Sequence, residues 1–489
     1  MPSFFEHRPS GPCTSRRSSL RAACAAALAL WAAPLRSTSA AHLTDVADAM
    51  DERHPVEVDL DFGYTHLKRQ AKITRENVQM DPATQKRGIV LVDELLPTET
   101  TDQLDFRLNV GLYHDLELHI IAPLLLGQKQ EWGFATVNGV SVQPVSTLQN
   151  NKINLSGCNA TGACDAANPI LPTPGQSLRA GFKDPTIGIA WGPINEEREQ
   201  QLRPDLFPPD HAVSTWVLGI DYTLPLPGDV DDPGKFIIPA PSPQTSPPTG
   251  PTMAANAGTA SHPVIRKAHV FSPWTAFSKR FKVLDPYFGV RANLPIPVGG
   301  SSAGDGSYDN CWHPDQLADV ATQNCANAAW KGETGYKPAY TGAFTFGTEL
   351  VVVDDKAAQQ KVAFDLHTEI TWFSPSRGYS QVSDALGKLT YEEEHVQALT
   401  TLGFYGRIAR WLHVRVSGTL GVDTPHFLTA ENIGKDLNGD GQVQISAGAA
   451  TKSLEQSPSY DFRLDQPGRR LRAEAIFIWG VSGALALNF

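Results

Sequence analysis

Long hydrophobic runs are missing from this sequence of 489 residues. No apolar stretch approaches the ~20 residues that a membrane-spanning helix needs, so helical membrane proteins are excluded. Charged residues are also scarce, at 19% against the roughly 25% of typical globular domains. Neither a Gly triplet nor a heptad repeats, which excludes collagen-like and coiled-coil chains. The formal net charge of −11 argues against a nucleic-acid binder that depends on overall basicity.

Cysteine is rare as well, with six residues in the whole chain. Two of them lie in the N-terminal leader described below, which leaves two local pairs, Cys158 with Cys164 and Cys311 with Cys325. In an exported protein, close pairs predict loop-closing disulfides; three connectivities are open, and proximity favours the local one. Zinc binding is the alternative, although neither pair has the CxxC spacing of common zinc sites.

The N-terminus has the pattern of an export signal. Arginines within residues 16–21 precede the apolar residues 22–35, and the small residues 37–41 follow. We therefore predict a secretory signal peptide over residues 1–41. Its removal takes away five Arg and one Glu, which changes the formal net charge from −11 to −15.

Residues 42–55 form a separate N-terminal segment. Thr44 is a candidate helix cap before residues 45–50. The segment is either a disordered leader or a plug for the structure that residues 56–489 form.

The rest of the chain alternates apolar and polar residues with period two, the mark of a strand with two unlike faces. Val58, Leu60 and Phe62, for example, alternate with Asp59 and Asp61. The segments with this pattern lie near residues 56–67, 102–112, 116–126, 184–193, 213–224, 264–278, 282–294, 340–353, 361–373, 395–409, 412–423 and 475–489.

Short and long joints alternate between these segments. The long connections run over residues 127–183, 225–263, 295–339 and 424–474. Such an order is typical of a barrel with short periplasmic turns and longer external loops. A soluble two-sheet sandwich also alternates its faces but does not readily explain the order. We predict an all-β fold: a transmembrane antiparallel β-barrel of about 12 strands over residues 56–489, with long extracellular loops.

The C-terminal segment alternates through to a terminal aromatic residue, Phe489. It resembles the final strand of Gram-negative outer-membrane β-barrel proteins. The resemblance implies that the barrel-insertion machinery recognises Phe489. It also implies a place in the bacterial outer membrane, in contact with outer-membrane lipid and lipopolysaccharide. A soluble protein that ends in an edge strand is the alternative, but a long exposed apolar edge is an aggregation liability.

A second resemblance covers residues 55–225. The sequences LYHDLEL at residues 112–118 and FKDPTIGIAWG at residues 182–192 resemble barrels of the "MetA-pathway of phenol degradation" type. That family consists of proposed outer-membrane transporters for aromatic compounds. The matched residues are turn and strand pattern and not substrate ligands, so the resemblance supports the architecture more than the cargo.

Charged residues on the inward faces of the predicted strands are the candidate selectivity residues. The strand near 361–373 places Asp365, His367 and Glu369 on the face opposite its apolar residues. Neighbouring strands add inward positions at Glu349, Arg407 and Arg415. These residues either form a charged constriction, as in selective pores, or a network of salt bridges that satisfies the interior.

The inner face also has apolar positions, Ile121, Leu125, Leu399, Ile476 and Ile478. A mixed lumen favours small amphipathic or aromatic solutes over a wide ion pore. It is equally typical of a barrel that its own side chains fill.

A candidate calcium loop lies at residues 436–441, DLNGDG. It resembles the opening of EF-hand calcium loops, in which side chains of Asp436, Asn438 and Asp440 and the carbonyl of Gln442 would bind Ca²⁺. Ala447 stands where such loops have a bidentate Glu, so another carboxylate, such as that of Glu431, would have to supply the missing oxygens. A solvated turn is the alternative.

Enzyme motifs are missing. The chain has no His-x-Ser-Asn-Gly element of outer-membrane phospholipases and no Walker loop or Rossmann fingerprint after a strand. We therefore predict that the protein is not an enzyme and binds no nucleic acid. The predicted function is an outer-membrane channel for passive uptake of small solutes, with hydrophobic or aromatic compounds as candidate cargo. The alternative is a structural or surface-interaction barrel with a closed lumen and functional loops.

Overall fold

A computed structural model describes the chain from residue 42 to its C-terminus, with gaps. The described residues are 42–47, 49–51, 54–80, 85–143, 146–150, 175–202, 206, 211–227, 237–239, 264, 266–298, 328–330, 333, 335–355, 360–386, 388–409, 411–444, 454–461 and 463–489. The predicted signal peptide, Ala447 and the cysteines of both predicted disulfides (Cys158, Cys164, Cys311 and Cys325) lie outside these residues, so the disulfides stay a prediction.

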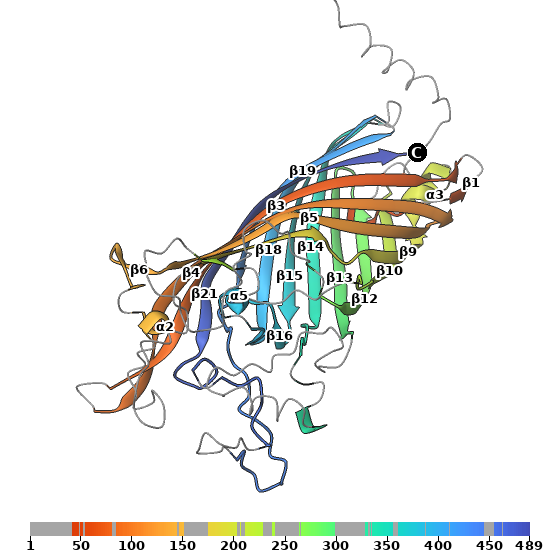
Figure 1. Cartoon of the computed structure of the whole chain (residues 1–489). Helices are drawn as coiled ribbons and strands as arrows, with labels where there is room; N and C mark the ends of the chain where they lie inside the picture. The colour runs from red at the N-terminus through yellow and green to blue at the C-terminus, as the bar shows by residue number, and fades with distance from the viewer. Residues whose placement is uncertain are drawn as a thin grey trace, which may run out of the picture. The chain divides into compact units, whose positions relative to one another are not determined.

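The described part of the chain is built mainly from long antiparallel strands (Figure 1). The twelve strands of the wall are β3 (Val58–Met80), β4 (Arg87–Tyr113), β5 (Leu116–Phe134), β9 (Thr186–Asn195), β10 (Val213–Thr223), β12 (Ala268–Arg280), β13 (Leu284–Pro297), β14 (Thr341–Asp355), β15 (Gln360–Phe373), β18 (His395–Ala409), β19 (Leu412–Asp423) and β21 (Leu471–Asn488). The shorter elements are η1 (His42–Thr44), β1 (Ala49–Asp51), β2 (His54–Val56), β6 (Thr136–Val137), β7 (Val140–Ser141), α2 (Thr147–Asn150), β8 (Gly175–Phe182), α3 (Glu196–Leu202), β11 (Ile237–Pro239), η4 (Ala328–Trp330), β16 (Ser376–Gly378), α5 (Ser383–Leu386), β17 (Thr390–Glu392) and β20 (His426–Phe427).

The sheet closes on itself. Each wall strand pairs with the next one along the chain, β21 returns to β3, and β5 pairs with β9. Closure leaves the wall without a free edge, which is the condition for a sheet that spans a membrane. Each of the twelve predicted segments lies on one wall strand, so the prediction of an antiparallel barrel of about 12 strands is confirmed.

The two ends of the wall can be told apart by their joints. The Val58 and Phe489 backbones exchange hydrogen bonds of 3.2 and 2.9 Å, so the first and last strands meet at one end. The short joints after β4, β12, β14 and β18 lie at this end as well. Because short turns mark the periplasmic side of such barrels, we assign this end as periplasmic and the opposite end as extracellular.

The wall is interrupted once, between β8 and β9. Both strands pair with β5: Phe182 of β8 lies opposite Leu124, and Thr186 of β9 lies opposite Ile121. The break falls at Pro185, which has no N–H to donate to the ladder. On its other edge β9 pairs with β10, whereas β8 pairs with the short β11. The sequence pattern predicts a strand near residues 184–193, which corresponds to β9, and predicts no strand at β8.

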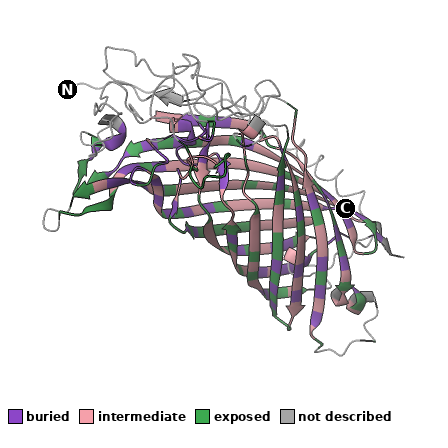
Figure 2. Cartoon of the chain, turned by 90° about the horizontal axis from the view of Figure 1, so that it is seen from below, coloured by how far each residue is buried: buried purple, intermediate pink, exposed green. Residues whose placement is uncertain are grey.

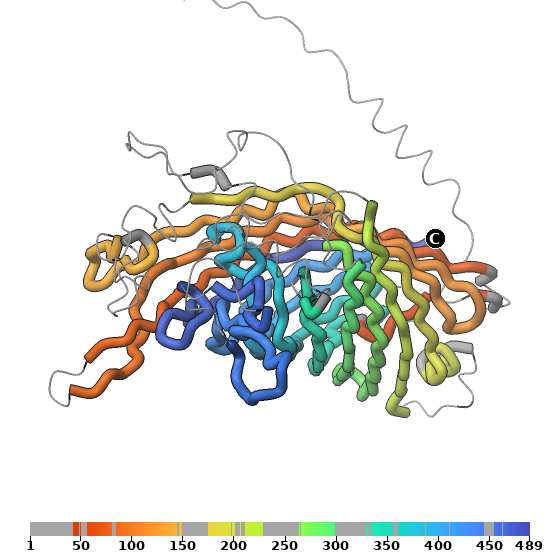
Figure 3. Tube along the Cα trace, turned by 60° about the horizontal axis from the view of Figure 1, so that its bottom comes forward, coloured from red at the N-terminus to blue at the C-terminus, as the bar shows by residue number. Residues whose placement is uncertain are grey.

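Three strands extend well past their predicted ends at the extracellular side. β3 continues to Met80, β4 begins at Arg87, and β5 continues to Phe134. Residues 68–76 read KRQAKITRE, which is polar on both strand faces, so period-two alternation gives no signal there. The tube view shows these extensions reaching beyond the shorter strands (Figure 3).

Burial alternates along the wall strands as the sequence pattern predicts (Figure 2). On β15, Phe364, Leu366 and Trp372 are exposed, whereas Lys361 and Ala363 are buried. The exterior is thus a belt of large apolar side chains over a closed sheet, which makes this a transmembrane β-barrel. Barrels of this type belong to bacterial outer membranes, and we place the chain there.

Among the described residues, no helix has both the length and the apolar character to cross a membrane.

The closing seam is fastened on the inside by a buried polar network. His119 of β5, Gly188 of β9 and Asp221 of β10 lie in register on three consecutive strands. His119 Nε2 lies 3.0 Å from Asp221 Oδ1, and its Nδ1 lies 3.1 Å from Glu117 Oε1. The two side chains meet over Gly188, where a Cβ would fall 2.2 Å from His119 Nε2 and 2.4 Å from Asp221 Oδ1. Only glycine leaves room for this contact.

Substitution of Gly188 should therefore weaken the barrel. Gly188→Ala forces the buried His119–Asp221 contact apart, although Asp221 keeps its contacts with Arg291 and Trp274. The loss of this buried contact costs about 1–3 kcal/mol of unfolding free energy. Gly418→Ala is the matched control, because a Cβ there meets nothing within 4 Å. Denaturant unfolding of the refolded protein in detergent measures both variants. Equal unfolding midpoints for the two variants would show that the network does not stabilise the seam.

Candidate functional site

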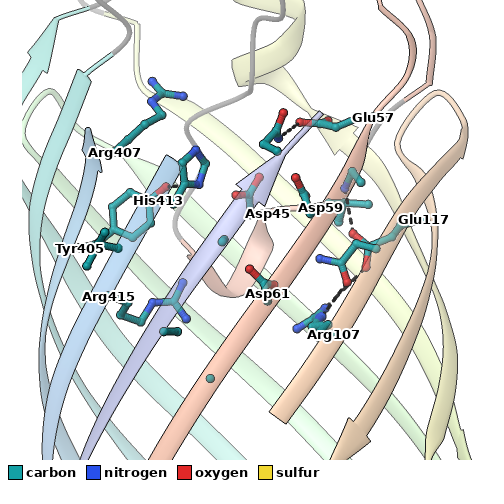
Figure 4. A pocket seen from close by; sticks show the side chains of 18 of the residues that line it. Asp45, Glu57, Asp59, Asp61, Arg107, Glu117, Tyr405, Arg407, His413 and Arg415 are labelled. Carbon is teal, nitrogen blue, oxygen red and sulfur yellow. Dashed lines mark hydrogen bonds and ion pairs between the residues drawn. The ribbon is translucent and has the colours of Figure 1, made fainter. Parts of the chain in front are cut away.

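The barrel encloses a cavity of about 340 Å³ near its periplasmic end. Most of the lining side chains are charged or polar, and they come from the N-terminal segment and from wall strands (Figure 4). The lining residues are Asp45, Val46, Ala47, Glu57, Asp59, Asp61, Gly63, Asp105, Arg107, Asn109, Glu117, Ile121, Glu349, Lys361, Tyr405, Arg407, His413, Val414, Arg415, Ala484, Ala486 and Asn488.

The cavity is a groove between two flanks of opposite charge. Asp59 and Asp61 of β3 form the acidic flank together with Asp45 of the N-terminal segment, and Arg407 of β18 and Arg415 of β19 form the basic flank, beside His413. The floor is Ala484 and Ala486 of β21, the strand that separates β3 from β19. Figure 4 shows the two flanks on either side of this strand.

Strand register dictates this arrangement. His413 lies opposite Ala486, Ala486 lies opposite Asp61, and Asp61 lies opposite Arg107 on consecutive strands. Residues in register on neighbouring strands point to the same face of a sheet. A histidine, an alanine and a carboxylate therefore follow one another along a single inward row.

Residues 42–47 of the N-terminal segment lie inside the barrel. Thr44 Oγ1 is 2.9 Å from Ser278 Oγ, and the Ala47 N–H donates to Glu117 Oε2 at 2.8 Å. Val46 is buried in an apolar cluster of the lumen wall. The expected helix over residues 45–50 is wrong: Ala47 donates to a wall strand instead of to the carbonyl four residues earlier. The 3₁₀ turn η1 precedes an extended passage that ends in β1.

The sequence-predicted selectivity residues fall into two groups. Glu349, Arg407 and Arg415 line the cavity, and Glu349 also pairs with buried Lys361 (Oε2 to Nζ, 3.3 Å). The other group lies outside the cavity lining and takes part in inward polar contacts. Tyr287 donates to Asp365 at 2.6 Å.

Asp365 also lies 2.6 Å from His367 Nδ1, whereas Glu369 accepts from Thr345 at 3.3 Å and from Thr371 at 3.2 Å. The structure thus brings three of the six predicted residues together at the cavity. The other three, Asp365, His367 and Glu369, lie in a network of inward polar contacts, which was the alternative interpretation.

Sequence reasoning missed most of the carboxylates of the cavity. Asp59 and Asp61 were visible only as the polar face of an alternating strand, and Glu117 and Asp105 had the same weak signal. Asp59 and Asp61 face the basic flank because β19 lies two places from β3 in the closed sheet. Sequence periodicity does not reveal which strands are neighbours.

The apolar inward residues lie mainly toward the extracellular end. Ile121 lines the cavity and Leu125 is buried, whereas Ile476 and Ile478 belong to a hydrophobic core, against which Leu399 packs. This core also contains residues of the loops after β5, β15 and β19. Apolar packing therefore lies above the charged cavity.

The loop of residues 374–394 reaches across this end of the barrel. It leaves β15 and returns to β18, yet Asp384 in its helix α5 forms a buried ion pair with Arg179 of β8. Gln130 and Trp132 of β5 donate to the Gln381 carbonyl at 2.8 and 2.6 Å. The loop is thus attached to strands that lie far from β15 around the wall.

A second long loop, residues 424–470, packs against the first (Figures 1 and 3). Lys388 lies 3.9 Å from Asp461 and 3.7 Å from Asp465, all three being buried. Burial raises the pKa of Asp465 to about 6, although Lys388 opposes this. Burial acts in the same direction on Asp461, but Lys388 and Arg463 outweigh it and hold the pKa of Asp461 well below its usual range.

The candidate calcium loop is an ordered turn. Asp436 accepts hydrogen bonds from the Gly439 and Gly441 N–H groups at 2.6 and 2.7 Å, and both glycines have positive φ. Asn438 and Asp440 likewise accept backbone N–H groups within the turn.

Outside the turn, Glu455 accepts from the N–H groups of Leu437 and Gln444. Glu431 pairs instead with Arg377 and is not the missing carboxylate. Calcium binding by Asp436, Asn438, Asp440 and the Gln442 carbonyl stays a prediction.

Comparison with known proteins identifies similar solved structures only. No family model matches the chain, so the resemblance to MetA-pathway barrels is not confirmed, and no curated protein matches either. The COG4313 outer membrane channel from Pseudomonas putida F1 aligns over 88% of this chain and 95% of its own, at 7% identity and a TM-score of 0.35.

The TodX monoaromatic hydrocarbon channel, as a deltaS2 mutant, aligns over 94% and 99% at 9% identity, with a TM-score of 0.27. A FadL homologue of Pseudomonas aeruginosa aligns over 89% and 90% at 8% identity, with a TM-score of 0.28. At these identities and scores the similarities assign no function to this chain.

The Asp384–Arg179 pair should hold loop 374–394 in place. Burial alone would raise the pKa of Asp384, but hydrogen bonds from Arg179 lower it, so the pair is ionised at neutral pH. Asp384→Asn removes the carboxylate that faces the buried Arg179 guanidinium, and breaking a buried ion pair in this way costs about 3–5 kcal/mol. We expect trypsin to cleave the loop of the folded variant at Arg377 and Lys388 much faster than that of the parent chain.

Asp440→Asn, in the exposed turn, is the control and should leave cleavage unchanged. In the parent chain the stabilisation is lost as the pH falls through the lowered pKa of Asp384, which hydrogen exchange of the loop can follow. Parent-like cleavage of Asp384→Asn would show that the pair does not hold the loop.

Proposed function

We propose that this chain is an outer-membrane channel for passive passage of small solutes. The observation that carries the proposal is the cavity of about 340 Å³ with its charged lining, inside a closed wall whose exterior is apolar. Polar groups that only stabilise an interior pack against one another, whereas here they border space large enough for a small molecule.

The mobile parts of such a channel would be few. The wall is a closed antiparallel sheet, so its charged side chains are fixed by strand register. Among the described residues outside this sheet, the N-terminal segment lies at the periplasmic end of the lumen and the loops lie at the extracellular end. We propose that these two barriers, and not the wall, control passage. In this role the N-terminal segment is a plug.

The lining supports polar cargo over hydrophobic cargo. Seven carboxylates and four Lys or Arg side chains line the cavity. Apolar side chains such as Ile121, Val46 and Val414 are fewer in number than the charged and polar ones. Hydrophobic or aromatic solutes therefore remain the weaker of the two cargo proposals.

A barrel with a closed lumen that works through its loops is the second candidate. The observation in its favour is the apolar core that the extracellular loops form with β3, β4 and β21 above the cavity. A core of this kind stabilises a closed state.

Conductance distinguishes the two. We expect the refolded protein to conduct ions in planar bilayers, and deletion of residues 42–47 to raise the unitary conductance severalfold because it unblocks the periplasmic half of the lumen. Because both proteins are refolded from purified chain, an effect of the deletion on export cannot alter the measured conductance. Gly418→Ala serves as the control with an intact N-terminal segment. Absence of conductance in both the parent and the deletion variant would contradict the channel and favour the closed barrel.

A further inference from the structure

We propose that the lumen cavity binds small zwitterions, such as amino acids, that carry one carboxylate and one ammonium group. The carboxylate faces the basic flank at Arg407 and Arg415, and the ammonium faces the acidic flank at Asp59 and Asp61. This inference rests on the proposed channel function and names its substrate class.

The geometry of the floor sets the size of the ligand. Ala486 separates His413 from Asp61, and Ala484 separates Arg415 from Gly63, in register on β19, β21 and β3. The flanking strands are therefore two strand spacings apart, about 10 Å between backbones. Side chains from both flanks narrow this gap, whereas the short side chains of Ala484 and Ala486 leave the space between the flanks unfilled. A small molecule that carries both charges close together can span the remaining distance between the two flanks.

At the sides of the groove, side chains of opposite charge contact each other directly. Lys361 pairs with Glu349 at 3.3 Å, and Arg107 lies 3.5 Å from Glu117. Each of these pairs is a local contact at the side of the groove. The separation of opposite charges across the floor, in contrast, is a feature of the groove itself (Figure 4).

The charge pattern discriminates among solutes of equal size. An anion is attracted by the basic flank and repelled by the acidic one, and a cation experiences the reverse. A neutral solute loses hydration without gaining a charge contact. A zwitterion that lies across the groove gains both contacts at once. The field across the lumen therefore favours a dipolar solute over each of the three alternatives.

Flux through proteoliposomes tests this inference. The full-length refolded protein is reconstituted, and entry of four three-carbon solutes is measured at neutral pH: alanine as zwitterion, lactamide as neutral solute, lactate as anion and alaninamide as cation. We expect alanine entry to saturate with concentration and, at low concentration, to exceed lactamide entry about fivefold, as two modest charge contacts would give.

Paired neutralisations locate the effect. The double variant Arg407→Gln, Arg415→Gln should lose the advantage of alanine over lactamide and should admit alaninamide faster than lactate. The double variant Asp59→Asn, Asp61→Asn should also lose that advantage but should admit lactate faster than alaninamide. Lys129→Gln with Glu131→Gln, on the half-exposed extension of β5, is the control and should change neither. A heat-induced gel shift confirms that each variant is folded.

The outcomes separate this inference from the function on which it rests. If alanine and lactamide enter at equal rates through a conducting protein, the zwitterion site is wrong and the channel stands. The same holds if the paired neutralisations leave the alanine advantage intact. If none of the solutes enters and the protein does not conduct, the proposed function itself is wrong.

Discussion

Closure of the sheet is the constraint on which the rest of this structure depends. Inside a membrane every backbone N–H and C=O must find a partner within the chain, so an open sheet edge has no place there. The pairing of β5 with β9 completes the circle of strands. That seam is where the chain combines a strand break at Pro185 with the His119–Asp221 contact over Gly188. Once the seam is closed, the register of all twelve strands is fixed, and with it the position of every inward charge.

The seam network also reaches the N-terminal segment. Glu117 accepts a hydrogen bond from Ala47 and lies beside His119, so one carboxylate serves both the wall and the segment. The two barriers of the lumen therefore differ in construction. The extracellular one has an apolar core and several buried ion pairs, such as Asp384 with Arg179. The periplasmic one rests on a few hydrogen bonds and one small apolar cluster. Fewer buried contacts make an element easier to open, which places the softer barrier at the periplasmic end.

The sequence predicts the membrane-embedded wall well because lipid and lumen impose opposite demands on alternate residues. It predicts the extracellular structure poorly because that demand ends where the membrane ends. Ile73 and Leu95 are fully buried, but under loops and next to buried Arg75 and Glu94, so no alternation marks them. Half of the candidate selectivity residues line the cavity, and they were proposed from the same alternation that predicted the strands. Asp61 could not be placed at the cavity, because its position opposite the basic flank depends on β21, which lies more than 400 residues later in the chain.

The wall also explains how a chain with so few charges acquires a charged site. Outward positions are apolar because they face lipid, so the charges of the strands are concentrated on the inward face. Strand register then decides whether neighbouring charges cancel. Where β15 and β14 lie side by side, Lys361 and Glu349 form a pair. Where β21 interposes Ala484 and Ala486, charges of opposite sign stay apart. A larger side chain at either alanine would fill the groove, and a charged one would pair with a flank. The two small residues of the last strand thus keep the charge separation that the cavity presents to a solute.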